Sequence, residues 1–191
     1  MDPELAGETL GPGVETGHVP MGADRLYWFA TERASEGQLS PGGELPYLQA
    51  RFANWPEPIP RMLAATARDE VLRNDLYDRT PARTWARGPV VVVGDAAHPM
   101  RPHLGQGGCQ GLEDAAVLAA LPTAFARFAA FRRRRVRRIV GESALLGRVV
   151  NLRPAVLSAA AIRATALVPE AMLTRHIASV AARSAFTLPK G

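Results

Sequence analysis

The second half of the chain is dominated by apolar residues at helical spacing. A row of seven of them predicts one long amphipathic helix. These residues are Phe125, Phe128, Phe131, Val136, Ile139, Val140 and Leu146. The opposite face of this helix would carry the arginines Arg132 to Arg135, Arg137 and Arg138. Composition alone therefore favours solvated arginines along it.

Shorter helices are expected on both sides of this segment. One should begin within Gly107–Leu112 and run to Leu121, because Pro122 cannot continue it. Two further helical stretches, divided near Pro169, are expected in the tail. Earlier in the chain, residues 45–55 and 62–67 show helical patterns interrupted by prolines.

Runs of β-branched and aromatic residues predict strands in the first half. Residues 26–31 are dense in aromatic side chains and predict a strand, and residues 71–77 could form another. Val90–Val93 has no polar alternation, which favours a strand buried on both faces as in a parallel sheet. Residues 1–20 are rich in Gly, Pro, Glu and Thr without a period, so we expect a loop or a frayed start.

The composition is that of an ordinary globular protein. The chain has 191 residues, of which 47% are hydrophobic and 21% charged, so disorder is not the default. The first residues lack a signal peptide's basic start, and no stretch approaches the roughly 18 apolar residues of a membrane span. The single cysteine, Cys109, excludes an internal disulfide and agrees with a reducing, cytoplasmic location. Four scattered histidines offer no metal-ligand spacing.

The charge is unevenly distributed. Residues 1–114 hold ten Arg and sixteen Asp or Glu, a net charge of −6, whereas residues 115–191 have a net charge of +11. A basic half could bind nucleic acid or an anionic membrane. With twenty-two Arg and one Lys, solvated helix faces explain the excess more simply.

The stretch from Gly88 to Ala116 carries the candidate chemistry. A valine-rich strand ends in Asp95, a glycine-rich loop follows, and then a helix begins. Ligands of open α/β sheets lie at the carboxyl ends of strands, and a helix N-terminus offers unpaired N–H groups. Asp95 could accept hydrogen bonds from sugar-like hydroxyls. The pattern indicates a cofactor with polyol and electron-rich parts, without naming it.

This stretch closely resembles the second flavin-binding motif of the class A FAD-dependent aromatic monooxygenases, the family of p-hydroxybenzoate and salicylate hydroxylases. The matching positions are residues 94–98, Pro102, residues 104–110 and residues 113–115. The likeness extends over roughly residues 20–147, including residues 27–31, residues 78–81 with Trp85, and the arginine-rich helix. His103 stands where close members of the family usually have Asn.

The resemblance implies that FAD is the cofactor. Asp95 would hydrogen-bond the ribityl chain, and Pro102 would lie beside the isoalloxazine ring. Gly105, Gln106, Gly107 and Gly108 would present backbone N–H groups to the pyrimidine edge of the flavin. Gly94, Ala97 and Leu104 complete the expected cofactor-binding set. No catalytic side chain is expected among these residues.

The family also implies a fold and a reaction. The fold would be α/β, or α+β for this portion: the C-terminal half of a p-hydroxybenzoate-hydroxylase-like FAD/NAD(P)-binding fold, with an incomplete Rossmann-type sheet. Residues 1–84 would be part of a substrate-binding domain, residues 85–147 part of the FAD-binding domain, and residues 148–191 a helical extension. The reaction would use NAD(P)H and O2 to hydroxylate a small aromatic substrate.

Other polar residues are expected to be structural. We expect His98 to make a hydrogen bond within the loop and Cys109 to be a small packed residue. Asp78 and Arg79 are expected to form an ion pair, and Asp114 to be structural. Trp28 and Phe29 are neighbours on a strand, so at most one of them can line a substrate pocket.

No GxGxxG follows a strand near the N-terminus, so nothing here is expected to hold the ADP half of FAD. A truncated product, a misassigned start or a split protein would each explain this. We therefore expect the chain alone to lack flavin and to expose a sheet edge. The alternatives are an inactive remnant that does not hold FAD, or a basic protein that binds membranes or nucleic acid.

Overall fold

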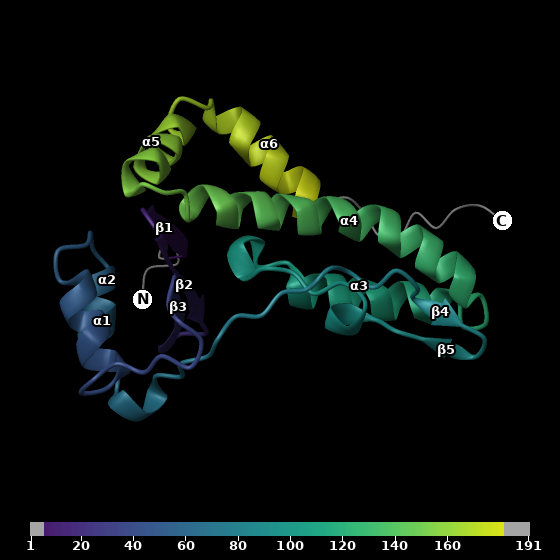
Figure 1. Ribbon diagram of the computed structural model, residues 1–191, viewed down its shortest axis with the longest axis horizontal. Coiled ribbons are helices and arrows are strands. Elements are labelled where there is room, and N and C mark those ends of the chain that lie inside the picture. Colours follow the sequence, from purple (N-terminus) through teal and green to yellow (C-terminus); the bar gives the residue numbers. More distant parts are fainter. Residues whose placement is uncertain (1–5, 182–191) are drawn as a thin grey trace. The chain divides into compact units, whose positions relative to one another are not determined.

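The computed structural model describes residues 6–181. The expectations for residues 1–5, and for residues 182–191 of the C-terminal extension, lie outside this range. The chain divides into two compact units (Figure 1). The larger comprises Met1–Arg33 and Tyr77–Gly191, and the smaller comprises Ala34–Leu76. The functional boundaries predicted at residues 84 and 147 stay a prediction.

The smaller unit is a pair of short helices. Both predicted helices form, although the second lies three residues earlier than predicted: α1 is Glu44–Phe52 and α2 is Ile59–Ala64, with a 3-10 turn at Arg68–Glu70. The rings of Phe52 and Trp55 meet edge to face, with centroids 4.8 Å apart. Leu45 and Phe52 of α1 are buried, as are Ile59, Met62 and Leu63 of α2, so apolar burial holds this unit together.

The strand considered for residues 71–77 does not form. Leu72 and Leu76 are largely exposed. Arg73 pairs with Asp75 at 2.6 Å, and Asp75 also accepts the Gly37 amide at 2.9 Å. These local contacts hold the segment in an irregular conformation that pairs with no strand of residues 6–181.

A three-stranded antiparallel sheet opens the larger unit. Its strands are β1 (Gly7–Gly11), β2 (Val14–Met21) and β3 (Arg25–Glu32), in the order β1-β2-β3. The prediction of a strand at residues 26–31 is confirmed. The prediction of a loop over residues 1–20 is wrong for the described part of that range. Gly13 and Gly22 turn the chain with φ of 76° and 75°, so the glycines mark hairpin turns rather than a loop.

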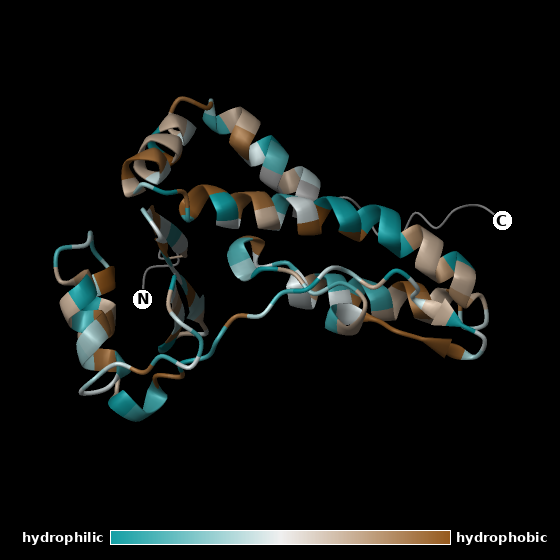
Figure 2. Cartoon of the chain, viewed as in Figure 1, coloured by the Kyte–Doolittle hydropathy of each residue, from teal (hydrophilic) through white to brown (hydrophobic). Residues whose placement is uncertain are grey.

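The helices of the larger unit follow the apolar pattern. They are α3 (Gly107–Ala120), α4 (Phe125–Val150), α5 (Ala155–Thr165) and α6 (Glu170–Ala181). A core cluster joins residues 82–100 to α3 and α4, and its buried members are Trp85, Ala97, Val117, Phe128, Ala129 and Val136. The arginine run makes the middle of α4 hydrophilic (Figure 2).

One arginine of that run contradicts the expected solvated face. Arg132 is fully buried, although Arg133 and Arg134 beside it are exposed. Residue 132 lies four residues after Phe128 and four before Val136, on the buried stripe of α4. Its position on the helix, rather than its residue type, therefore decides its burial.

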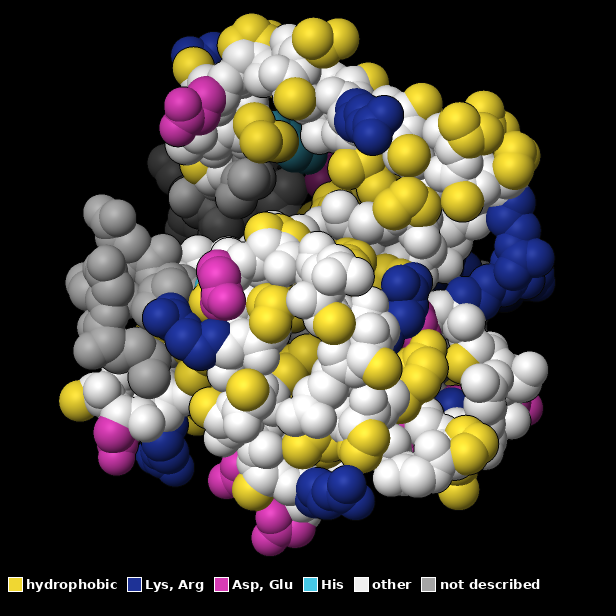
Figure 3. Space-filling view, turned by 90° about the vertical axis from the view of Figure 1, so that its left-hand side faces the viewer, with side chains coloured by type: hydrophobic (Ala, Val, Ile, Leu, Met, Phe, Trp, Pro, Cys, Tyr) yellow, Lys and Arg dark blue, Asp and Glu magenta, His cyan; other side chains and the backbone are white. Residues whose placement is uncertain are grey.

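The last two helices carry exposed apolar residues. Val156 and Leu157 of α5 and Met172 of α6 are more than half exposed. Figure 3 shows hydrophobic side chains and scattered arginines over these upper helices. Within residues 6–181, no single helix has the length and apolarity to cross a membrane; α5 taken with residues 170–176 meets that test only as a pair bent by 99°.

The valine-rich segment differs most from expectation. Only Val90–Val91 forms a strand, β5, which pairs antiparallel with β4 (Ala86–Arg87) across Gly88. Val90 is 61% exposed and Val93 38% exposed, so the prediction of a strand buried on both faces is wrong here. The physical reason is that β4 is its only partner among residues 6–181, which leaves one edge and much of its surface uncovered.

Candidate functional site

Asp114 is the buried centre of the region around the glycine-rich loop. Its Oδ2 accepts the Gly94 amide at 2.8 Å and lies 2.6 Å from His98 Nε2. Its Oδ1 accepts Arg132 Nε at 2.6 Å. Asp114, His98 and Arg132 all have fully buried side chains. Three segments of the chain are therefore tied to one carboxylate, and the structural roles predicted for Asp114 and His98 agree with these contacts.

Arg132 extends this network along α3. Its Nη1 donates to Glu113 at 2.5 Å, and its Nη2 donates to the backbone and side-chain oxygens of Gln110 at 3.0 and 2.9 Å. Arg135 also binds Glu113. The guanidinium group of Arg132 thus bonds in several directions, which compensates for its burial.

The ionisation of the two carboxylates reflects these contacts. Burial by itself raises the pKa of Asp114, but hydrogen bonds from His98, Arg132 and the Gly94 amide outweigh it and lower the pKa. Burial likewise raises the pKa of Glu113, and the hydrogen bonds from Arg135 and Arg132 lower it overall. Both groups are therefore held as anions that complement the arginines of α4.

The backbone that carries Asp95 is fixed from several sides. A 3-10 turn spans Gly94–Ala96, and Gly94 adopts a φ of 54°. Arg79 Nη2 donates to the carbonyls of Asp95 and Ala96 at 3.1 and 2.5 Å. The Ala82 amide donates to the Ala97 carbonyl at 2.8 Å. The carboxylate of Asp95 is thus carried by a turn whose backbone is held by hydrogen bonds.

A second turn leads into α3. Pro102–Leu104 forms a 3-10 turn, closed by the Gly105 amide donating to the Pro102 carbonyl at 2.7 Å. Gly105 has a φ of 60°, which favours glycine. The first N–H groups of α3 have no acceptor within the helix, and the side chain of Gln106, at its start, does not cap them. These donors and the positive end of the helix dipole face the loop.

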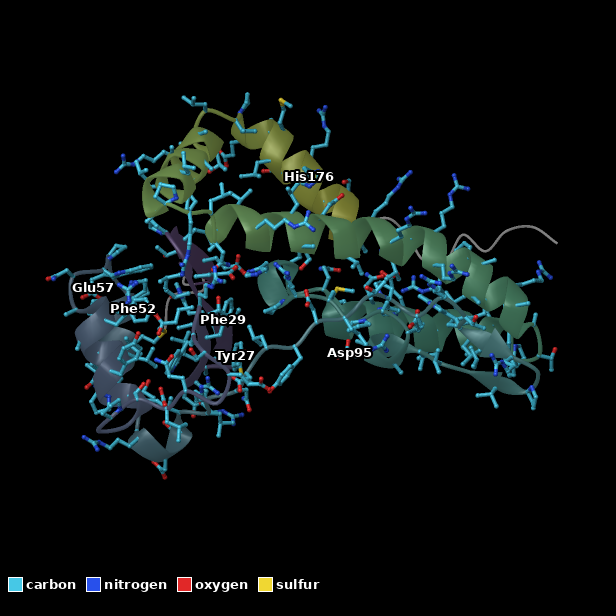
Figure 4. All side chains as sticks on the ribbon, in the orientation of Figure 1. Tyr27, Phe29, Phe52, Glu57, Asp95 and His176 are labelled. Atoms are coloured by element: carbon cyan, nitrogen blue, oxygen red, sulfur yellow. The ribbon has the colours of Figure 1, made fainter. Side chains whose placement is uncertain are left out.

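The two turns suit the flat, polyol-bearing cofactor implied by the sequence. Asp95 is exposed on its loop (Figure 4). No group of residues 6–181 donates a hydrogen bond to its carboxylate. A Cβ atom added at Gly94, Gly105 or Gly108 would meet nothing within 4 Å, so the backbone there is open to a ligand. Where Gly94 passes α3, its Cα lies 3.9 Å from where a Cβ of Gly111 would be. The residues present therefore fit FAD.

The other predicted cofactor residues lie in the same loop but differ in exposure. Pro102, Gly105 and Gly108 are exposed, and Leu104, Gln106 and Gly107 are half-buried. Ala97 is fully buried in the core cluster, so its side chain supports the loop from behind.

Two minor expectations are corrected by the contacts. Cys109 is exposed rather than packed, because it lies on the outer side of the first turn of α3. Asp78 pairs with Arg101 at 2.7 Å, while Arg79 turns to the backbone carbonyls of the Asp95 turn, so the expected Asp78–Arg79 pair is absent. The role of Arg79 was missed because every residue has a backbone carbonyl, so the sequence does not indicate which carbonyl accepts a hydrogen bond.

The comparisons with known proteins agree with this geometry. A family model described as an FAD binding domain matches residues 64–128. Aurachin C monooxygenase/isomerase of Stigmatella aurantiaca is 42% identical over 153 residues, which cover 76% of this chain and 40% of that protein. The chloroplastic zeaxanthin epoxidase of Prunus armeniaca is 41% identical over 100 residues, 52% of this chain and 15% of that protein.

The fold has a counterpart among solved structures. Klebsiella pneumoniae HpxO, crystallised with FAD and uric acid, is 25% identical and superimposes with a TM-score of 0.78. The match covers all of this chain and 51% of the HpxO chain. The chain thus spans about half of the HpxO chain and less than half of the two curated relatives. The predicted hydroxylase fold is confirmed, and these similarities support the assignment of the chain to the class A FAD-dependent monooxygenase family.

Proposed function

We propose that this chain supplies the loop and helix that bind the flavin end of FAD in a monooxygenase. The enzyme would use NAD(P)H and O2 to oxygenate an aromatic or related small molecule. The observation that carries the proposal is the pair of rigid turns that present Asp95 and the open N-terminus of α3 on one loop. A cytoplasmic location belongs to the same proposal, supported by the single cysteine.

The residues of the loop would have distinct tasks. The Asp95 carboxylate would accept hydrogen bonds from ribityl hydroxyls, because it is exposed and has no other donor in the described chain. The backbone N–H groups of Gly107 and Gly108 would favour negative charge on the ring edge next to them. When bound, the flavin would supply the electron transfer and oxygen activation. The protein would orient the flavin and exclude water.

The substrate would lie on the same face of the sheet as Phe29. In β3, Phe29 and Thr31 share a face, and Thr31 stands opposite Glu15 of β2, whose side chain contacts His103 beside the loop. Trp28 points to the other face. The rings of Tyr27 and Phe29 lie 6.2 Å apart (Figure 4). An aromatic surface on this face suits a ring-shaped substrate. The uric acid bound to HpxO is a ring-shaped molecule of this kind.

A complementation experiment tests the flavin site. The full chain is co-expressed with the part of the Stigmatella protein to which it is not matched, and bound FAD is measured by absorbance after purification. We expect a yellow complex, and we expect Asp95→Ala to lose most of its flavin.

Asp24→Ala is the matched control, because Asp24 is an exposed carboxylate in the turn between β2 and β3. A complex that stays colourless with excess FAD, or an Asp95→Ala complex with full occupancy, would contradict the proposal.

A further inference from the structure

Glu15 of β2 and His103 of the second turn form a buried pair across 88 positions of sequence. His103 Nδ1 lies 2.5 Å from Glu15 Oε2. The side chain of Glu15 is 1% exposed and that of His103 is 8% exposed. Nothing in the flavin site described above uses these two groups, although His103 is two residues from Gly105.

The helix α4 holds His103 from the other side. A Cβ atom at Gly147 would lie 2.5 Å from His103 Nε2, so only glycine leaves room for the imidazole. Ser143, one turn earlier, donates its hydroxyl to the Arg101 carbonyl at 2.6 Å. The turn is therefore clamped by α4 on one side and by Glu15 on the other.

The surroundings of Glu15 make it dependent on His103. Thr31 Oγ1 lies 3.4 Å from Glu15 Oε2, which makes a long hydrogen bond. Glu15 Oε1 is buried without a hydrogen-bond partner in the described chain. The nearby Glu8 carries a charge of the same sign as Glu15. The pKa of Glu8 is raised mainly by burial and then by the charge of Glu15, whereas His103 lowers it. Arg101, at the start of the turn, pairs instead with Asp78. A lost partner would leave a poorly compensated buried charge.

We propose that Glu15 and His103 are a positioning pair that fixes the turn before Gly105 and so directs the first N–H groups of α3 toward the flavin. The pair links the sheet that carries Phe29 to the flavin loop. This inference rests on the proposed function for its purpose, but its structural part can be measured without flavin.

Hydrogen exchange in the full chain is the first test. Glu15→Gln should speed exchange of the Gly105 amide, which donates to Pro102, by roughly ten-fold or more, as expected when a charge-assisted bond is lost. The Gln110 amide, which bonds Gln106 within α3, should change little. Equal acceleration of both amides, or no change at Gly105, would overturn the proposal, because either result assigns the pair to general stability or to nothing.

The second test is a double-mutant cycle on FAD affinity in the co-expressed complex, at a temperature where every variant is folded. Glu15→Gln and His103→Gln should each raise the dissociation constant about ten-fold, and the double variant should raise it no further. The double variant also leaves no buried charge unpaired, so it keeps the test open if a single variant does not fold. Glu57→Gln and His176→Gln, at exposed residues, are the matched controls (Figure 4).

The outcomes separate the two proposals. If the unchanged complex fails to bind FAD while Gly105 exchange responds as expected, the proposed function fails and the positioning of the turn stands. If the complex binds FAD and Asp95→Ala loses it, but Glu15→Gln and His103→Gln bind normally, the positioning role fails alone.

Discussion

Replacing Arg132 by Met is expected to destabilise the chain strongly. The change keeps an unbranched apolar stem but removes the guanidinium that bonds Asp114 at 2.6 Å, Glu113 at 2.5 Å and Gln110 at 2.9 and 3.0 Å. Removing one partner of a buried ion pair costs about 3–5 kcal/mol, because the remaining charge stays buried. Asp114 keeps its bonds to His98 and Gly94, so the lower end of this range applies.

Urea unfolding followed by circular dichroism, together with calorimetry, measures this effect. A loss of about 3 kcal/mol corresponds to a fall in Tm of about 6–12 °C for a chain of this size. The control is Arg134→Met, an exposed arginine of the same helix, which should stay within about 0.5 kcal/mol of the unchanged chain. If the two variants have the same unfolding free energy, Arg132 does not hold α3 to α4 and the network argument is refuted.

Three further outcomes are expected from other contacts of the larger unit. Because the folded-state pKa of Asp114 lies below its ordinary value of 3.8, its ionisation stabilises the fold above that pH, and this contribution is lost as pH falls through the folded-state pKa. Unfolding free energy measured against pH should show this loss, and Asp114→Asn should weaken the dependence on pH at acid pH. An unchanged pH dependence in that variant would contradict the assignment. Gly147→Ala should cost about 1–3 kcal/mol through its clash with His103, whereas Gly141→Ala, with open space, should stabilise α4 by about 0.5–1 kcal/mol. If thermal melts show the Tm of both variants changing in the same direction, the packing of Gly147 against His103 is refuted. Gly105→Ala should weaken FAD binding in the complex and cost about 1–2 kcal/mol, because its φ of 60° strains any side chain; normal affinity by titration would contradict the role of this turn.

The helices could be predicted because their apolar spacing is regular and their ends are marked. Pro122 ends the segment before α4, and Pro169 separates α5 from α6. The buried position of Arg132 was also present in the pattern, four residues from Phe128 and from Val136. It was missed because the arginines were interpreted together as one solvated face.

The sheet and the loop depend on partners far away in the chain. β2 was not predicted because Glu15 and Thr16 are polar yet buried, so the strand has neither an apolar run nor a polar–apolar alternation. The Glu15–His103 pair joins residues 88 positions apart, and no local pattern indicates such a contact. The valines of β5 predict a buried strand, but their actual exposure depends on which other strands cover them. The flavin contacts of Asp95 and of residues 105–108 stay predictions.

A crystal structure of the co-expressed complex with FAD tests the central claim most directly. The account predicts a ribityl hydroxyl within about 3.2 Å of the Asp95 carboxylate, the ordinary range for such a hydrogen bond. It also predicts that the pyrimidine edge of the flavin faces the backbone N–H groups of Gly107 and Gly108. A flavin bound elsewhere, with Asp95 free in solvent, would contradict it.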